Sequence, residues 1–147
     1  MKKLSIFITA LLMLCFIVNP TNSVQAVGLD KIIKNVEQTN KQINEEIEKA
    51  VYDSQKVLNK YNVDLKILEE GKDNVTNKND KKIQELKEKY TKEIDEIINN
   101  LLKVTNKMSA KTIKAAAKEG VAVYCEWIEV TIGGRTILVD PIRITNG

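Results

Sequence analysis

The segment LDKIIKNVEQTNKQINEEIEKAVYDSQKVLNKY, residues 29–61, decides the predicted fold through the spacing of its apolar residues. Positions that recur at alternating steps of four and three are Leu29, Ile33, Val36, Asn40, Ile43, Ile47, Ala50, Ser54, Val57 and Tyr61. This spacing keeps one narrow seam in line along a helix, as in a coiled coil. Asn40 and Ser54 are polar seam residues, which either specify register or are tolerated imperfections. A second step of four, from Tyr61 to Leu65, should unwind the supercoil locally.

A second helical segment follows a polar turn. Its apolar positions, again three or four apart, are Ile83, Leu86, Tyr90, Ile94, Ile97, Leu101, Val104 and Met108. The predicted arms, about residues 29–70 and 79–119, would each be about 60 Å long at 1.5 Å per residue. Arms of equal length around a turn at about 71–78 predict an antiparallel helical hairpin over residues 27–119. Ser109 leaves two alternatives, because it either lies within one continuous helix or caps a separate short one.

Residues 120–147 have a different composition, rich in Val, Ile and Thr and without lysine. Gly133-Gly134 between two strand-like runs is typical of a two-residue β-hairpin turn. The register that this turn implies places Val130 opposite Ile137 and Ile128 opposite Val139, on one apolar face with Ile132. Asp140-Pro141 should end or bulge the pairing, because proline cannot donate to the ladder.

The predicted fold class is therefore α+β, mainly α: a long antiparallel, coiled-coil-like helical hairpin followed by a C-terminal β-hairpin over residues 120–147. A two-helix seam is a thin core, and an isolated two-stranded hairpin is marginally stable in water. The remaining apolar surface could be buried in three ways: by the β-hairpin folding onto the helices, by a second copy of the chain, or by a partner protein.

Residues 1–26 have the pattern of a cleavable secretory signal peptide. Lys2 and Lys3 precede a 15-residue apolar run, residues 4–18, and Val24-Gln25-Ala26 suits cleavage after Ala26. A bilayer span takes about 20 residues, which makes an uncleaved anchor the weaker alternative. We expect a secreted protein, extracellular or associated with a cell wall, with no stable membrane span after cleavage. The lysine- and asparagine-rich, arginine-poor composition is typical of an AT-rich bacterial genome.

The composition excludes several chemistries. The chain has no histidine, which removes Ser-His and Cys-His catalysis and the commonest zinc-ligand sets. The net charge is +3, and loss of Lys2 and Lys3 would bring it to +1, so nothing indicates a polybasic nucleic-acid surface. We therefore expect no enzyme, no cofactor, no metal and no nucleic-acid partner. The remaining enzymatic alternative depends on carboxylates or on Cys125.

One group of residues in the tail is a candidate partner contact. It consists of Trp127, the only tryptophan, together with Glu126, Glu129 and Asp140. The alternative is that Trp127 packs on the helices and that the carboxylates keep an edge strand solvated. Cys125, the only cysteine after residue 26, is either packed and inert or forms an intermolecular disulfide.

These features predict a secreted, non-enzymatic interaction or structural protein. Its helical hairpin and β-hairpin would serve self-association or the binding of a protein partner that the sequence does not identify. The alternative is a small secreted inhibitor or immunity-type binder of a specific enzyme or toxin, with the Trp127 group as its contact.

Overall fold

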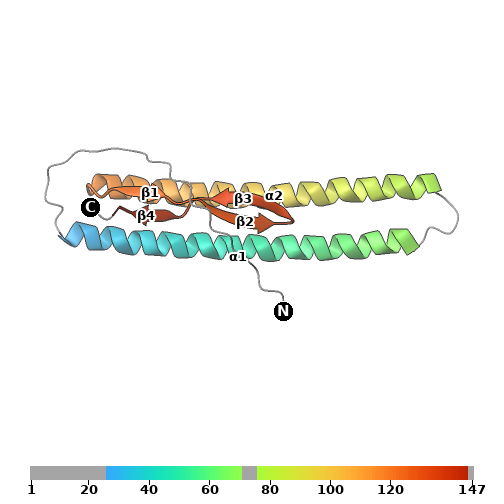
Figure 1. The fold of residues 1–147 in the computed structure, drawn as a ribbon, viewed down its shortest axis with the longest axis horizontal. Coiled ribbons are helices and arrows are strands. Elements are labelled where there is room, and N and C mark those ends of the chain that lie inside the picture. Colours follow the sequence, from blue (N-terminus) through green and yellow to red (C-terminus); the bar gives the residue numbers. More distant parts are fainter. Residues whose placement is uncertain (1–25, 71–75, 146–147) are drawn as a thin grey trace.

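A computed structural model describes residues 26–70 and 76–145. Helices α1 (Ala26–Glu70) and α2 (Thr76–Lys118) lie side by side and antiparallel, and strands β1 (Val123–Cys125), β2 (Ile128–Ile132), β3 (Arg135–Val139) and β4 (Ile142–Ile144) follow them (Figure 1). The predicted α+β, mainly α class and the predicted order of helices and strands are confirmed. The signal-peptide prediction, except for Ala26, and residues 71–75 of the predicted turn lie outside the described residues. Nowhere in the described ranges is a helix apolar over enough of its length to span a membrane.

Helix α2 is continuous through Ser109 and ends near Gly120. The Ser109 hydroxyl donates to the carbonyl of Asp140 at 2.7 Å, so it links the helix to the strands and does not cap a separate helix. At the C-terminus Val121 N donates to the carbonyl of Ala116, and Gly120 adopts a φ of 69°. These are the features of a Schellman motif, in which a left-handed glycine turns the chain away from the helix axis.

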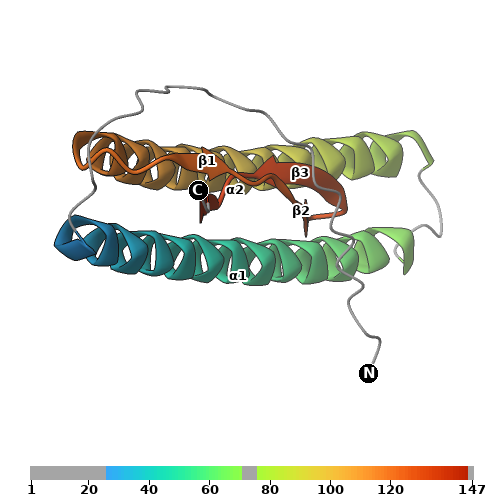
Figure 2. The same cartoon turned by 60° about the vertical axis from the view of Figure 1, so that its left-hand side comes forward.

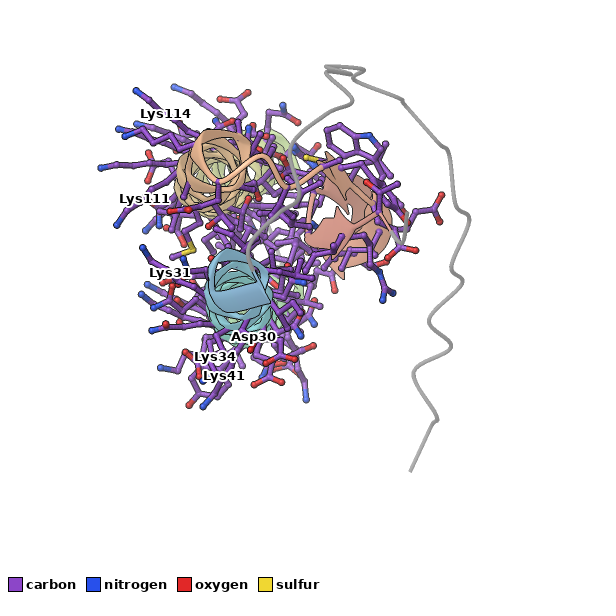
Figure 3. All side chains as sticks on the ribbon, turned by 90° about the vertical axis from the view of Figure 1, so that its left-hand side faces the viewer. Asp30, Lys31, Lys34, Lys41, Lys111 and Lys114 are labelled. Carbon is purple, nitrogen blue, oxygen red and sulfur yellow. The ribbon has the colours of Figure 1, made fainter. Side chains whose placement is uncertain are left out.

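The strands form a ribbon over the groove between the two helices. Figure 3, which looks along the helices, shows the ribbon on one side of the helix pair. Ile132 and Val139 are fully buried there in one cluster with Ile43 and Ile94, and Ile142 is fully buried in a second cluster with Ile32, Val36 and Ala116. The β-hairpin therefore folds onto the helices, which is the intramolecular alternative of the three considered for covering the apolar surface. It covers the part of the helices near Ala26 and Lys118, which we call the base.

The buried surface of the helices is wider than the predicted seam. Leu29, expected in the seam, is 37% exposed, and Ile32 takes the buried position instead. On α2 a second row is buried beside Ile94 and Leu101, namely Ile98, Thr105, Ser109, Thr112 and Ala116. The reason is that each helix packs against both the other helix and the ribbon, so two adjoining faces become buried. Within this broad interface the Thr39 and Thr112 hydroxyls share a hydrogen bond of 2.7 Å.

The predicted strand register is confirmed, and the ribbon extends further than its central pairs. Cys125 pairs with Ile142 on one side of the break between the two sheets, and Ile128 pairs with Val139 on the other side. Each strand therefore advances by three residues across the break, so the two sheets share one register. Pro141 lies in that break and accepts a hydrogen bond from Glu126 N at 2.8 Å, but it has no N–H to return. The expected interruption at Asp140-Pro141 is therefore present as a gap in the ladder.

The ribbon makes a half-turn about its own axis at this break. Strand β1 contacts α2 whereas its continuation β2 contacts α1, and β3 and β4 exchange helices in the same way. The inward side chains change accordingly, from the odd-numbered Val123 and Cys125 to the even-numbered Ile128 and Val130. Two-stranded ribbons twist strongly, and the missing proline hydrogen bond allows the twist to concentrate here.

The ribbon covers only part of the helices. Its turn at Gly133 reaches Tyr90 and Ile94 of α2, and Figure 2 shows both helices continuing beyond it. We call this continuation, residues 57–70 and 76–90, the arm. In the arm the Tyr61 and Tyr90 rings pack with centroids 4.8 Å apart, and the other seam residues are only half-buried.

Candidate functional site

The predicted site residues lie around the break in the ribbon. Cys125 ends β1, Glu126 and Trp127 occupy the break, and Asp140 lies on the facing strand. Glu129 lies on β2 opposite Leu138, where both side chains are exposed. Trp127 is half-buried and lies between the two paired segments, outside both strands of the ladder.

Asp140 is the buried carboxylate of this group. The residue is 8% exposed, Oδ1 has no hydrogen-bond partner, and Oδ2 accepts a hydrogen bond from the Cys125 thiol at 3.8 Å. Burial raises the pKa of Asp140 above its ordinary value of 3.8, and hydrogen bonds from its own main chain and from Cys125 partly oppose this shift. Asp140 is a carboxylic acid, and its partner Cys125 is a thiol, which is only weakly acidic. A carboxylate next to a thiol does not favour formation of the thiolate.

The raised pKa gives a prediction for stability. The folded protein holds the Asp140 proton more tightly than the unfolded chain, so ionisation of this carboxyl weakens the fold as pH rises through its folded pKa. The quantity to compare is the free energy of unfolding of the wild type minus that of Asp140→Asn. We expect this difference to increase as the pH is lowered from about 7 to about 4. Urea unfolding at several pH values measures this. Glu129→Gln controls for loss of one exposed carboxylate. The assignment is contradicted if the free energy of unfolding of the wild type minus that of Asp140→Asn stays constant or falls as the pH is lowered.

The other two carboxylates do not join Asp140 in a catalytic pair. Glu126 forms an ion pair with Arg143, the residue opposite Tyr124 on β4. Glu129 is exposed and faces Leu138 across the ribbon. In the described ranges, moreover, no three or more His, Cys, Asp or Glu side chains are grouped as metal ligands would be. The predicted acidic group thus divides into a buried carboxyl, an ion-paired one and a solvated one.

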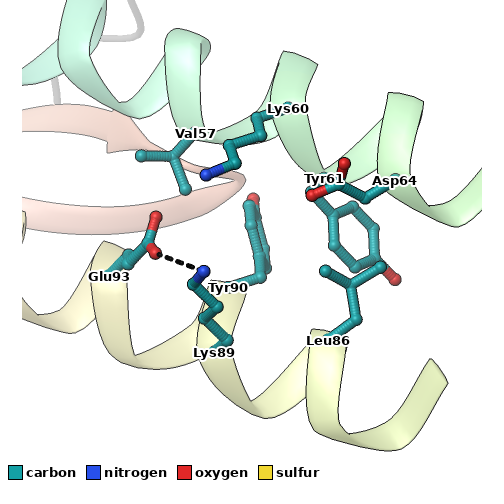
Figure 4. Close-up of a pocket in the computed structure, with 8 residues that line it drawn as sticks. All are labelled: Val57, Lys60, Tyr61, Asp64, Leu86, Lys89, Tyr90 and Glu93. Carbon is teal, nitrogen blue, oxygen red and sulfur yellow. Dashed lines mark ion pairs between the residues drawn. The ribbon is translucent and has the colours of Figure 1, made fainter. Parts of the chain in front are cut away.

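A hollow at the start of the arm is too small for a substrate. Figure 4 shows it between the helices, lined by Val57, Lys60, Tyr61, Asp64, Leu86, Lys89, Tyr90 and Glu93. Its volume is about 20 Å³, and a water molecule needs about 10–15 Å³, so the hollow has room for about one water. The Tyr90 hydroxyl donates to the Gly133 carbonyl at 3.2 Å, which fixes the turn of the ribbon beside this hollow.

Sequence reasoning missed a row of lysines on α2. Lys103, Lys107, Lys111, Lys114 and Lys118 are all exposed, and no acidic residue lies between residues 97 and 118. The small net charge of the whole chain, +3, concealed this local excess. A count of charges by helix face, made separately for each half of each helix, would have found it.

Comparisons with known proteins give no relative on which to base a function. No family model matches the chain, and neither the curated proteins nor the solved structures contain a significant match.

Proposed function

We propose that this chain is a secreted, non-enzymatic interaction protein in which the ribbon stiffens the base of a helical hairpin and the arm binds another protein, either a second copy or a partner. The observation that carries the proposal is the exposure of two large apolar side chains on the arm. Val63 is 59% exposed and Ile67 is 63% exposed, one helical turn apart on α1.

The two side chains belong to one stripe on the outer side of α1. Tyr52, 60% exposed, lies on the same side three turns earlier, about 22 Å from Ile67 along the helix, with the exposed polar residues Lys56 and Asn59 between. Scattered exposed apolar residues are ordinary, but aligned ones on a helix are the pattern that helix-mediated recognition uses. The half-buried Tyr61 packs on Tyr90 of α2, and the Lys56 ammonium lies 4.6 Å from the centroid of the Tyr52 ring, so Val63 and Ile67 are the more open apolar side chains of this side.

The arm is also held in a defined direction. Both arm helices continue without interruption from the base, where the ribbon and the two helices share one core. A rigid helix face loses little conformational entropy when a partner binds, and this favours recognition by the arm over recognition by a flexible segment.

The double variant Val63→Glu, Ile67→Glu tests the arm. We expect it to abolish self-association in light scattering, or the crosslinks formed in culture supernatant, because two charges would have to be desolvated at the interface. Its stability should change by less than about 0.5 kcal/mol, since both positions are exposed. Leu138→Glu, on the ribbon and 48% exposed in the wild type, is the matched control and should leave association intact. A compact wild-type monomer that binds no hydrophobic dye and forms no crosslinks would overturn the proposal.

A second candidate, an inhibitor or immunity-type binder, has one observation in its favour. Trp127 is half-buried at the break and outside the strand ladder, so part of the indole is accessible to a partner. The same crosslinking experiment includes Trp127→Ala. Loss of crosslinks from this variant, with the arm variant unaffected, would favour this second function over the first.

A further inference from the structure

The second half of α2 carries a lysine row, defined as Lys103, Lys107, Lys111, Lys114 and Lys118. Successive members are three or four residues apart, so they follow one side of the helix. At 1.5 Å per residue the row is about 22 Å long, and neighbouring lysines are about 4.5–6 Å apart along the axis. The α2 segment therefore presents a one-dimensional array of positive charge.

The row is displayed on a rigid support. The opposite side of the same segment is buried, where Ser109 is hydrogen-bonded to the ribbon and Thr112 to Thr39 of α1. Figure 3 shows Lys111 and Lys114 projecting from α2 on the side away from the ribbon, and Lys31 of α1 projecting on that side as well. The helix backbone under the row is thus held on two sides while the lysine side chains remain in solvent.

The chain does not neutralise these lysines. Over the described residues, lysine ion pairs involve Lys31, Lys41, Lys66, Lys81 and Lys89, and none involves a member of the row. The acidic residue that follows the row, Glu119, lies 3.7 Å from Lys31 of α1. The positive charge of the row is accordingly available to an external anion.

Folding does not account for the row. Like charges four residues apart, such as Lys103 with Lys107 and Lys107 with Lys111, destabilise a helix. A lysine in the last turn interacts favourably with the helix dipole, but this effect is confined to that turn and so applies to Lys118. Repulsion between Lys103 and Lys107 thus opposes helix formation, and the helix dipole does not offset it at these positions.

We propose that the lysine row binds a flexible linear polyanion with closely spaced phosphates, which lies along α2 on the side away from the ribbon. A lysine ammonium is a compact charge on a flexible stem, so five of them can follow a polymer that has no fixed shape. This surface is separate from the arm, and its binding does not depend on the function proposed for the arm.

Two other anionic partners fit the surface less well. Membrane-surface helices combine lysines with large apolar side chains, but the exposed ones here, Leu29, Tyr52, Val63, Ile67 and Leu138, all lie outside residues 97–118. Proteins that bind single-stranded nucleic acids stack bases on aromatic side chains, and residues 97–118 contain none. A solvated polyphosphate chain requires neither feature.

Binding of inorganic polyphosphate to the purified protein tests the proposal. Counterion release of about 0.7 per phosphate predicts a slope of about −3.5 in log K against log salt for five contacts, or about 100-fold weaker binding at 200 mM than at 50 mM salt. Substitution of all five row lysines by glutamine should weaken binding at least about tenfold and bring the slope close to zero. Its melting temperature should equal or exceed that of the wild type, which separates loss of binding from loss of folding.

The control variant removes the same charge from other exposed positions, Lys60, Lys66, Lys82, Lys87 and Lys92, each to glutamine. It should bind polyphosphate within about twofold of the wild type, because it leaves the row intact. Equal loss in both variants would overturn the proposal, since net charge alone would then explain binding. Tighter binding to a single-stranded oligonucleotide or to anionic lipid vesicles than to polyphosphate would also overturn it, as would no binding at low salt.

Discussion

Gly133→Ala should destabilise the protein by about 2–4 kcal/mol, the largest effect expected from the addition of one methyl group. An alanine Cβ at this position would lie 2.6–2.9 Å from three side-chain atoms of Ile94, which is fully buried and cannot move into solvent. The residue also has a φ of 55°, in the left-handed region, where a side chain adds further strain. The variant must therefore either lift the turn of the ribbon from α2 or displace Ile94.

Gly134→Ala is the matched control for this prediction. Gly134 has a φ of 79°, but an added Cβ would meet no atom within 4 Å, so only the backbone strain of about 1–2 kcal/mol applies. Urea unfolding of both variants measures the difference. Ile94→Val removes Cδ1, the atom closest to the added Cβ, and should reduce the cost of Gly133→Ala in a double-mutant cycle. Equal destabilisation by the two glycine variants would show that Ile94 does not restrict the turn.

Asn40→Ala should destabilise the protein by about 2–4 kcal/mol, because it removes two hydrogen bonds to one buried residue. The Asn40 amide donates from Nδ2 to the Ile142 carbonyl and accepts at Oδ1 from Ile142 N, both at 2.8 Å. The side chain thus takes the place of a neighbouring strand beside β4. Ile142 is fully buried, so both of its main-chain groups would lose their partner without gaining water.

Asn44→Ala, one helical turn further along α1 and exposed, is the control and should change stability by less than about 0.5 kcal/mol. Asn40→Asp keeps the acceptor but loses the donor, and it places a negative charge beside the Ile142 carbonyl, so it should not rescue stability. Hydrogen exchange at the Ile142 amide supplies a local measurement and should accelerate at least about tenfold in Asn40→Ala. Unfolding of Asn40→Ala at the wild-type midpoint would mean that this pairing does not hold β4 to the helix.

The roles of polar seam residues illustrate what periodicity can predict. Asn40 and Ser54 both occupy seam positions, and the heptad pattern alone offers the same alternatives for each. In the structure Asn40 binds the main chain of β4, whereas the Ser54 hydroxyl donates to the Val51 carbonyl of its own helix. The first residue therefore specifies where the ribbon docks, and the second is a tolerated polar side chain. The difference depends on a contact between residues 102 apart in the chain, which no local pattern contains.

The candidate site was less predictable than the fold. The sequence placed Glu126, Glu129 and Asp140 close together along the tail and suggested one acidic group around Trp127. The half-turn of the ribbon separates their environments, so Asp140 is buried beside Cys125 while Glu126 pairs with Arg143 at the surface. The lysine row was present in the sequence at helical spacing, but the whole-chain charge hid it.

Local sequence patterns were sufficient to predict two long helices from the spacing of residues 29–61 and its repeat, the end of the second helix near Gly120, and the strand register on either side of Gly133-Gly134. These features depend on interactions between residues close in the chain, which leave a periodic or turn-specific pattern. Three features depend instead on tertiary packing: Ile32 is buried in place of Leu29, the ribbon turns over at Pro141, and Asn40 holds β4. The physical reason is that each helix is buried against two neighbours at once, and the identity of the second neighbour depends on how the distant tail packs.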